Sequence, residues 1–277
     1  MQPLSCARFR EVLNMKLTPW LIRQSGGPRR VRLYCFSYSG GSAASYLPWQ
    51  EDLEPDIEIC AVQLPGRGAR AGEKPYSSLP TLIETLAQII AKHSASEDKL
   101  PFAFFGHSLG AIVAFEVARY CKRHYFPMPR RIFVSGCDAP QHRSPCKNLH
   151  KLSDSDLIDA LKDYNGTPPE ILEHRELMDL VLPAIRADFS LGETYRYLPS
   201  HPLNIPITVL AGKLDEHILL EELQEWRKET TNECRVQWFE GDHFYINAEK
   251  QGVLEVLKAE LADIQYVQSI SSGAGQL

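Results

Sequence analysis

The apolar residues of the chain alternate between short continuous runs and longer stretches with helical spacing. Short apolar runs predict strands buried on both faces, and the helical spacing predicts helices between them. The predicted strands cover residues 30–38, 57–64, 102–105, 131–135, 207–210 and 236–239. The predicted helices cover residues 79–93, 109–125 and about 249–264. This order predicts an α/β fold in which helices flank a mostly parallel sheet.

One stretch, from about residue 141 to residue 202, interrupts this alternation. It contains helical segments at residues 153–164 and 169–188 but no convincing strand. Insertions between the strands of such a sheet usually lie over the carboxyl ends of the strands, where ligands bind. We therefore predict a helical lid on the substrate side, with ordinary helical packing elsewhere on the sheet as the alternative.

The length of 277 residues, 44% of them hydrophobic, is sufficient for one large core. We predict a single domain over residues 30–264, with a partly flexible N-terminal extension at 1–29 and a flexible tail at 265–277. Met15 offers a second possible start. Because the chain shows neither a signal peptide nor a membrane-spanning stretch, we expect a cytoplasmic protein.

Charge and cysteine content narrow the possible functions. The formal net charge of -5 is mild and the basic residues are scattered, so nucleic-acid or membrane binding is not expected to be the main task. The seven cysteines form no C-x-x-C pair, and several lie in apolar runs, which indicates buried free thiols in a reducing compartment. They are Cys6, Cys35, Cys60, Cys121, Cys137, Cys146 and Cys234.

The strongest chemical motif is Gly106-His107-Ser108-Leu109-Gly110. It follows the apolar run 102–105 and opens an apolar helix, which is the strand–turn–helix context of a nucleophile elbow. Side chains in place of the two glycines would collide with the neighbouring strand and helix. The motif predicts an α/β-hydrolase fold with Ser108 as the nucleophile.

A serine nucleophile needs a base and an acid, which follow it in this fold in the order acid, then histidine. His243 lies in a glycine-containing loop between the last predicted strand and the final helix, so we predict that it is the base. His201 and His217 are expected to be loop or surface residues. Asp215 and Asp138 each follow a predicted strand, and the spacing alone leaves both open as the acid.

The oxyanion hole requires two backbone amides beside the serine. One is predicted to come from Leu109, directly after the nucleophile. The other is predicted to come from Ser39, or from Tyr38, where Gly40-Gly41 lets a substrate approach the backbone. The alternative is that this segment is an ordinary turn.

Taken together, these segments resemble the type II thioesterases of nonribosomal peptide and polyketide synthesis, which are related to the medium-chain thioesterase of fatty-acid synthesis. The resemblance covers residues 30–262, with Pro183-Ala-Ile-Arg-Ala-Asp188 as a further match in the lid. Leu64-Pro65-Gly66-Arg67 is more specific than the elbow; relatives often have Phe-Pro-Phe-Ala-Gly-Gly where this chain has Phe-Ser-Tyr-Ser-Gly-Gly. The matching segments are residues 34–42, 63–70, 104–110 and 241–245.

This resemblance implies hydrolysis of acyl groups from the phosphopantetheine arm of carrier-protein domains, by editing or product release. It places the acid after the penultimate strand, which favours Asp215 over Asp138, and it implies a helical lid with a shallow acyl pocket. No metal or cofactor is implied beyond the phosphopantetheine of the substrate, and a monomer is expected. Arg67 and Arg70 are left open between a functional role near the cleft and a structural salt bridge.

Three alternatives remain at this point. The first is a carboxylesterase or lipase that acts on small oxygen esters, because the elbow is shared across the fold. The second is a non-catalytic protein that binds acyl carriers, against which the intact set of Ser108, His243 and Asp215 argues. The third is a releasing domain embedded in a synthase; the absence of a carrier remnant before residue 30 favours a free-standing enzyme.

Overall fold

The computed structural model describes residues 19–24, 29–95, 99–142, 147–164, 166–167 and 169–273, without the side chains of residues 263 and 265–273. Within these ranges the centre is a seven-stranded sheet in the order β1-β3-β2-β4-β5-β6-β7. All neighbouring strands are parallel except β1, which is antiparallel to β3. The strands are β1 (Leu21–Ile22), β2 (Val31–Phe36), β3 (Ile57–Val62), β4 (Phe102–His107), β5 (Ile132–Ser135), β6 (Ile207–Gly212) and β7 (Cys234–Phe239).

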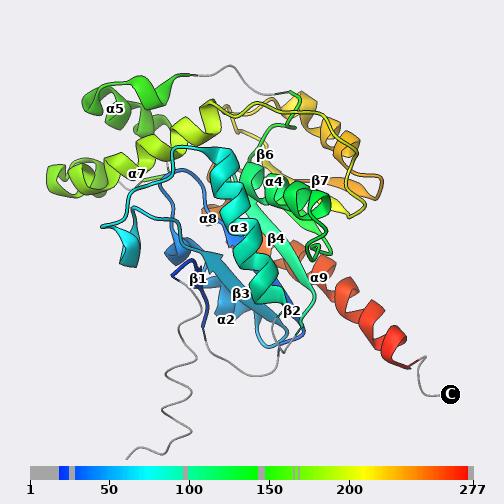
Figure 1. The fold of residues 1–277 in the computed structure, drawn as a ribbon. Helices are drawn as coiled ribbons and strands as arrows, with labels where there is room; N and C mark the ends of the chain where they lie inside the picture. Colours follow the sequence, from blue (N-terminus) through cyan, green and yellow to red (C-terminus); the bar gives the residue numbers. More distant parts are fainter. Residues whose placement is uncertain are drawn as a thin grey trace, which may run out of the picture.

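Helices pack on both faces of this sheet (Figure 1). On one face, α3 (Leu79–Ser94) and α4 (Leu109–Arg123) share a core with alternate strand residues such as Phe104. On the other face, α2 (Trp49–Leu53) and α9 (Lys250–Gly273) share a core with the intervening residues of the same strands, such as Phe105. Successive strand side chains point to opposite faces, so a strand covered on both sides must be apolar at nearly every position. The predicted α/β class and parallel sheet are confirmed.

The structure adds strand β1, which the hydrophobic pattern does not predict. It pairs Leu21 with Val62 of β3, and the Trp20 ring packs edge-on against Tyr76 at 5.6 Å. A two-residue strand is too short to produce a recognisable alternation. Residues 19–24 therefore belong to the domain, which corrects the expected extension at 1–29. Residues 1–18 and 25–28, with Cys6 and Met15, lie outside the described residues.

The C-terminal boundary also differs from the prediction. Helix α9 continues to Gly273, so residues 265–273 are helical where a flexible tail was expected. The segment between Val253 and Ser272 contains no glycine or proline, the residues that most often end a helix, so nothing local stops it. Residues 274–277 lie outside the described residues.

The predicted lid is helical and has a small core of its own. Its elements are η3 (Leu149–Lys151), α5 (Asp154–Tyr164), α6 (Pro169–Leu172) and α7 (Arg175–Glu193). The predicted segment 169–188 is two helices, because the His174 side chain caps a new helix by accepting from the Leu177 amide at 3.4 Å. Helices α5 and α7 lie together beyond one end of the sheet (Figure 1). The remaining elements are η1 (Ala43–Ser45), η2 (Gly68–Arg70), η4 (Leu220–Glu229) and α8 (Tyr245–Ala248).

The described cysteines are free thiols, as predicted. Cys35, Cys60, Cys121 and Cys137 are buried, and Cys234 is half-buried. Burial raises the pKa of the Cys60 and Cys121 thiols to about 12, which keeps them protonated and unreactive. Cys146 lies outside the described residues. A helix with the length and apolar character needed to span a membrane is absent from the described part of the chain.

The start of α4 approaches the sheet so closely that only glycine fits there. A Cβ atom on Gly110 would lie 2.0 Å from the carbonyl oxygen of Phe36 in β2, and one on Gly106 would lie 2.1 Å from the carbonyl oxygen of Gly110. Both clashes involve backbone atoms, so no side-chain rotation can relieve them.

We expect Gly110→Ala to lower the free energy of unfolding by about 3 kcal/mol or more, because α4 would have to move away from β2. Gly72→Ala is the matched control, since a Cβ at Gly72 meets nothing within 4 Å, and its effect should stay within about 0.5 kcal/mol. Urea unfolding measures both. Equal stability of the two variants would contradict this account of the α4–β2 contact.

Candidate active site

Ser108 lies at a sharp turn between β4 and α4, as the elbow motif predicts. Its backbone has φ 55° and ψ −116°, a region that non-glycine residues rarely occupy. The turn is tied to the sheet by a 2.8 Å hydrogen bond from the Ser108 amide to the carbonyl of Ser135 in β5. Such strain persists only where surrounding contacts enforce it, and it is concentrated at functional sites.

His243 and Asp215 form a buried pair at the ends of neighbouring strands. His243 Nδ1 lies 2.7 Å from Asp215 Oδ2, and the two residues are 3% and 2% exposed. The other carboxylate oxygen of Asp215 accepts from the His217 amide at 2.9 Å, which fixes the orientation of the carboxylate. A proton held on Nδ1 by Asp215 leaves Nε2 of His243 able to accept one.

Asp138, the other candidate acid, has a different hydrogen-bond partner. Its Oδ1 accepts from the Leu219 amide at 2.6 Å, at the end of the loop that begins with Asp215. Asp138 therefore holds this loop in place, while Asp215 contacts the imidazole. The geometry agrees with Asp215 as the acid.

Two cavities meet at Ser108. They have volumes of about 390 Å³ and about 240 Å³ and share five lining residues, which are Ser39, Ser108, Tyr164, Phe189 and His243. Ser39, Ser108 and His243 each follow a strand, β2, β4 and β7, whereas Tyr164 and Phe189 come from the lid helices α5 and α7. The lid thus lies over the carboxyl ends of the strands, where it was predicted.

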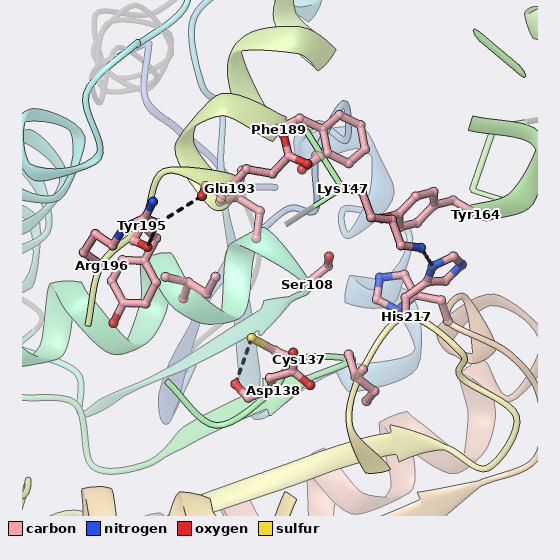
Figure 2. A pocket seen from close by; sticks show the side chains of 17 residues that line it. Ser108, Cys137, Asp138, Lys147, Tyr164, Phe189, Glu193, Tyr195, Arg196 and His217 are labelled. Atoms are coloured by element: carbon pink, nitrogen blue, oxygen red, sulfur yellow. Dashed lines mark hydrogen bonds between the residues drawn. The ribbon is translucent and has the colours of Figure 1, made fainter. Parts of the chain in front are cut away.

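Ser108 projects from the start of α4 into the larger cavity (Figure 2). Tyr164 and His217 lie on one side of it, and Tyr195 and Arg196 lie on the other. The serine hydroxyl is therefore accessible from this cavity, and different residues line the cavity on the two sides of the serine.

The two predicted oxyanion groups are both at this site. Leu109 is the first residue of α4, so its amide has no acceptor within the helix and is available to an oxygen near Ser108. Ser39 lies inside a turn closed by a 2.9 Å hydrogen bond from the Gly41 amide to the Tyr38 carbonyl. Ser39 and Leu109 both line the larger cavity with Ser108.

His217 is a site residue that the sequence reasoning missed. It lies in a loop, as expected, but its ring is stacked on Tyr164 with centroids 3.9 Å apart and lies 5.4 Å from His243. Lys147 Nζ lies 3.1 Å from its Nδ1. Burial, the neighbouring His243 and Lys147 lower the pKa of His217. Its place two residues after Asp215 is the one sequence signal that could have revealed it.

His107 is a buried imidazole that lies beside His243. Its Nδ1 lies 2.9 Å from Ser135 Oγ, which in turn lies 2.5 Å from the Tyr245 hydroxyl. Full burial, and then the proximity of His243, hold the pKa of His107 well below its usual value. No permanent positive charge therefore faces His243 from His107.

Arg67 and Arg70, whose roles the sequence left open, both form ion pairs. Arg67 pairs through both terminal nitrogens with Asp188 of α7, and the guanidinium is buried. Arg70 pairs with Glu73 and stacks on the Trp20 ring at 4.0 Å. Both therefore support the structure of the loop after β3.

Comparison with known proteins places this geometry in a family. The thioesterase domain model matches residues 31–261. The chain is 38% identical to linear gramicidin dehydrogenase LgrE of Brevibacillus parabrevis, over 83% of this chain and 88% of the relative. It is 35% identical to the gramicidin S biosynthesis protein GrsT of Aneurinibacillus migulanus, over 89% and 95%. The structure of BorB, a type II thioesterase from the borrelidin biosynthetic cluster, matches with a TM-score of 0.79 at 32% identity, over 87% and 97%.

We expect Asp215→Asn to slow the labelling of Ser108 by a serine-directed fluorophosphonate by about 10³- to 10⁴-fold, because the amide no longer holds the proton on Nδ1 of His243. Asp138→Asn should label at nearly the wild-type rate, since an amide oxygen can still accept from Leu219. The opposite ranking of the two variants would assign the acid to Asp138.

Proposed function

The chain belongs to the type II thioesterases, serine hydrolases that act on thioesters, and from this premise we propose that it releases acyl groups from the phosphopantetheine arm of carrier-protein domains. The observation that supports this most directly is the buried His243–Asp215 pair at a cavity that also exposes the strained Ser108. In a family whose model covers residues 31–261, this pair and serine supply the three groups that the reaction needs.

The proposed reaction has two halves. His243 takes the Ser108 proton on Nε2 while Oγ attacks the thioester carbonyl carbon, and the amides of Leu109 and Ser39 hold the resulting oxyanion. The C–S bond breaks, the pantetheine sulfur takes the proton from His243, and the acyl group stays on Ser108. A water molecule, deprotonated by His243, then attacks the acyl-serine. The bond between the acyl carbon and Oγ breaks, His243 returns the proton to Ser108 Oγ, and the free acid leaves. Asp215 orients the imidazole and stabilises its charged form throughout.

The two cavities suit different parts of the substrate. The smaller one has apolar lid side chains along its wall, namely Leu161, Ile171, Val181, Ile185 and Phe189. The larger one also has apolar residues in its wall, but of the two it alone has charged side chains, namely Asp138, Lys147, Glu193 and Arg196, with His217 beside them. We assign the apolar cavity to the acyl group and the polar cavity to the amide-rich pantetheine arm, because each then keeps surroundings of its own polarity.

The dehydrogenase name of one relative raises a second possibility, hydride transfer with a dinucleotide. Residues 66–71 match the letters of a dinucleotide fingerprint, Gly-x-Gly-x-x-Ala, after strand β3. That fingerprint needs a helix whose amino end faces the pyrophosphate. Here the segment forms only the three-residue turn η2, and Arg67 is engaged with Asp188. The geometry therefore favours thioester hydrolysis.

The names of two relatives connect those proteins with the biosynthesis of gramicidin S and borrelidin. By analogy we propose that this chain works beside a peptide or polyketide synthase, where it edits stalled carriers or releases products. The thioester-bearing carrier domain is its proposed partner.

Wild-type protein should hydrolyse an acyl thioester on a carrier protein with a kcat/KM well above that for a p-nitrophenyl ester of the same acyl group. Ser108→Ala should lower thioester hydrolysis by about 10⁴-fold or more, because the nucleophile is removed. Preference for the aryl ester would support a carboxylesterase. Full hydrolysis by Ser108→Ala would exclude the proposed mechanism, and no hydrolysis by the wild type would favour a non-catalytic carrier-binding protein.

The cavity assignment predicts that Val181→Trp shifts the preferred acyl length toward shorter chains, because the larger ring fills part of the apolar cavity. The measurement is kcat/KM for a series of carrier-bound chains from acetyl to decanoyl. Leu180→Trp is the matched control, since Leu180 is 62% exposed on the same helix. An equal loss for all lengths in Val181→Trp would place the acyl group elsewhere.

A further inference from the structure

A buried ion pair joins the lid to the turn that contains Ser39. Arg67 Nη1 lies 2.6 Å from Asp188 Oδ2, and Nη2 lies 2.8 Å from Oδ1. Both side chains are almost fully buried, at 7% and 2% exposed. Asp188 belongs to lid helix α7 and Arg67 to the loop after β3, so the pair connects two segments 121 residues apart in the sequence.

Each partner of this pair also forms a hydrogen bond with the backbone of the turn at residues 38–41, which contains Ser39. Asp188 Oδ2 accepts from the Gly40 amide at 2.8 Å, and Arg67 Nη1 donates to the Gly41 carbonyl at 2.9 Å. Gly40 has φ +78°, which is the conformation that a type II turn requires at its third residue. The bond to Asp188 therefore fixes the central peptide of the turn, the one that directly follows Ser39.

Helix α7 is also seated directly on this turn. A Cβ atom on Gly40 would lie 2.8 Å from Cγ1 of Ile185, one helical turn before Asp188. Helix α7 and the turn are therefore in close contact at Gly40, and the position of the turn depends on the position of the helix.

We propose that Asp188 and Arg67 are positioning residues that couple the seating of lid helix α7 to the orientation of the Ser39 amide in the oxyanion hole. With α7 seated, the carboxylate holds the Gly40 amide and the guanidinium holds the Gly41 carbonyl. The Gly41 amide in turn donates to the Tyr38 carbonyl, which shares its peptide unit with the Ser39 N–H, so this N–H points to where the oxyanion develops. When α7 lifts, the turn loses the Asp188 contact and Arg67 loses the carboxylate that orients it, so the turn that holds the Ser39 N–H is free to rearrange. The inference rests on the proposed function and adds that oxyanion stabilisation requires the lid in place.

A structural role alone does not explain this arrangement. A buried ion pair is often no more stabilising than well-packed apolar residues, because both charges lose their hydration. A pair used only to attach the lid has no need of the Gly40 amide or the Gly41 carbonyl. The contacts that hold the lid elements to one another are separate, since Arg186 of α7 donates to the carbonyls of His150 and Leu152 and pairs with Asp154, away from the turn.

The test compares Asp188→Asn and Arg67→Lys with Arg186→Gln as the lid control. Hydrolysis of a carrier-bound acyl thioester gives kcat and KM. An alkyl boronic acid, which forms a tetrahedral adduct on the serine with an oxygen in the oxyanion hole, reports on the positioned amides. A non-hydrolysable thioether analogue of the acyl-pantetheine reports on ground-state binding only.

We expect Asp188→Asn to lower kcat by about 10- to 100-fold, less than the loss of a whole oxyanion donor, with KM nearly unchanged. The inhibition constant of the boronic acid should rise by the same factor, while the affinity for the thioether stays the same. Arg67→Lys, which keeps the charge but loses the two-pronged contact, should change both quantities in the same direction by a smaller factor. Arg186→Gln should lower the melting temperature without affecting kcat.

Three results would overturn the inference. The first is an equal loss of boronic acid and thioether affinity in Asp188→Asn and Arg67→Lys, which indicates a purely structural pair. The second is a fall in kcat for Arg186→Gln as large as that for Asp188→Asn, which indicates that lid stability alone matters. The third is unchanged kcat in both variants of the pair. Each leaves the proposed function intact as long as Ser108→Ala is inactive, whereas an active Ser108→Ala refutes that function independently.

Discussion

The close approach of α4 to strands β2 and β4 is the constraint on which the site depends. Gly106 and Gly110 allow backbone atoms to come within the space that a Cβ would occupy, and this contact forces Ser108 into its strained conformation. The same contact directs the start of α4 at the hydroxyl, and there the Leu109 amide has no acceptor within the helix. The position of Ser108 and its electrostatic surroundings thus have a single cause, the absence of two side chains.

The sheet supplies the remaining groups because its parallel strands all end at the same edge. Ser39, Ser108, Asp138, Asp215 and His243 each follow a different strand, so segments spread over 205 residues meet in one place. The loop after β6 has two tasks there. Asp215 contacts the His243 imidazole, and the hydrogen bond from Leu219 to Asp138 keeps that loop against the end of β5.

The two imidazoles beside His243 add little positive charge to its surroundings. His107 and His217 lie within 5.0 and 5.4 Å of the His243 ring, between centroids, and burial lowers the pKa of both. In the proposed reaction, a neutral imidazole does not oppose the positive charge that His243 gains with the Ser108 proton. The apolar lid residues beside this group exclude water from one side of the site, which strengthens the remaining polar contacts.

The sequence by itself determined the sheet, its main helices, the lid and the elbow. Continuous apolar runs, helical spacing and the Gly-x-Ser-x-Gly turn are local consequences of burial and of steric exclusion, so they appear in neighbouring residues. Ser108 and His243 could be located because each lies beside such a local signal. The two-residue strand β1 was missed because it is shorter than any periodic pattern, and the extension of α9 to Gly273 was missed because residues 265–273 are mostly polar or small.

Only the tertiary structure decided which partners these residues have. Asp215 and Asp138 follow neighbouring strands and are equivalent in spacing, and the structure separates them through one contact to an imidazole and one to a loop amide. The stacking of His217 on Tyr164 and the pairing of Arg67 with Asp188 join segments far apart in the chain. Such contacts depend on how strands and lid are placed relative to one another, and no property of either residue's neighbours in sequence contains that information.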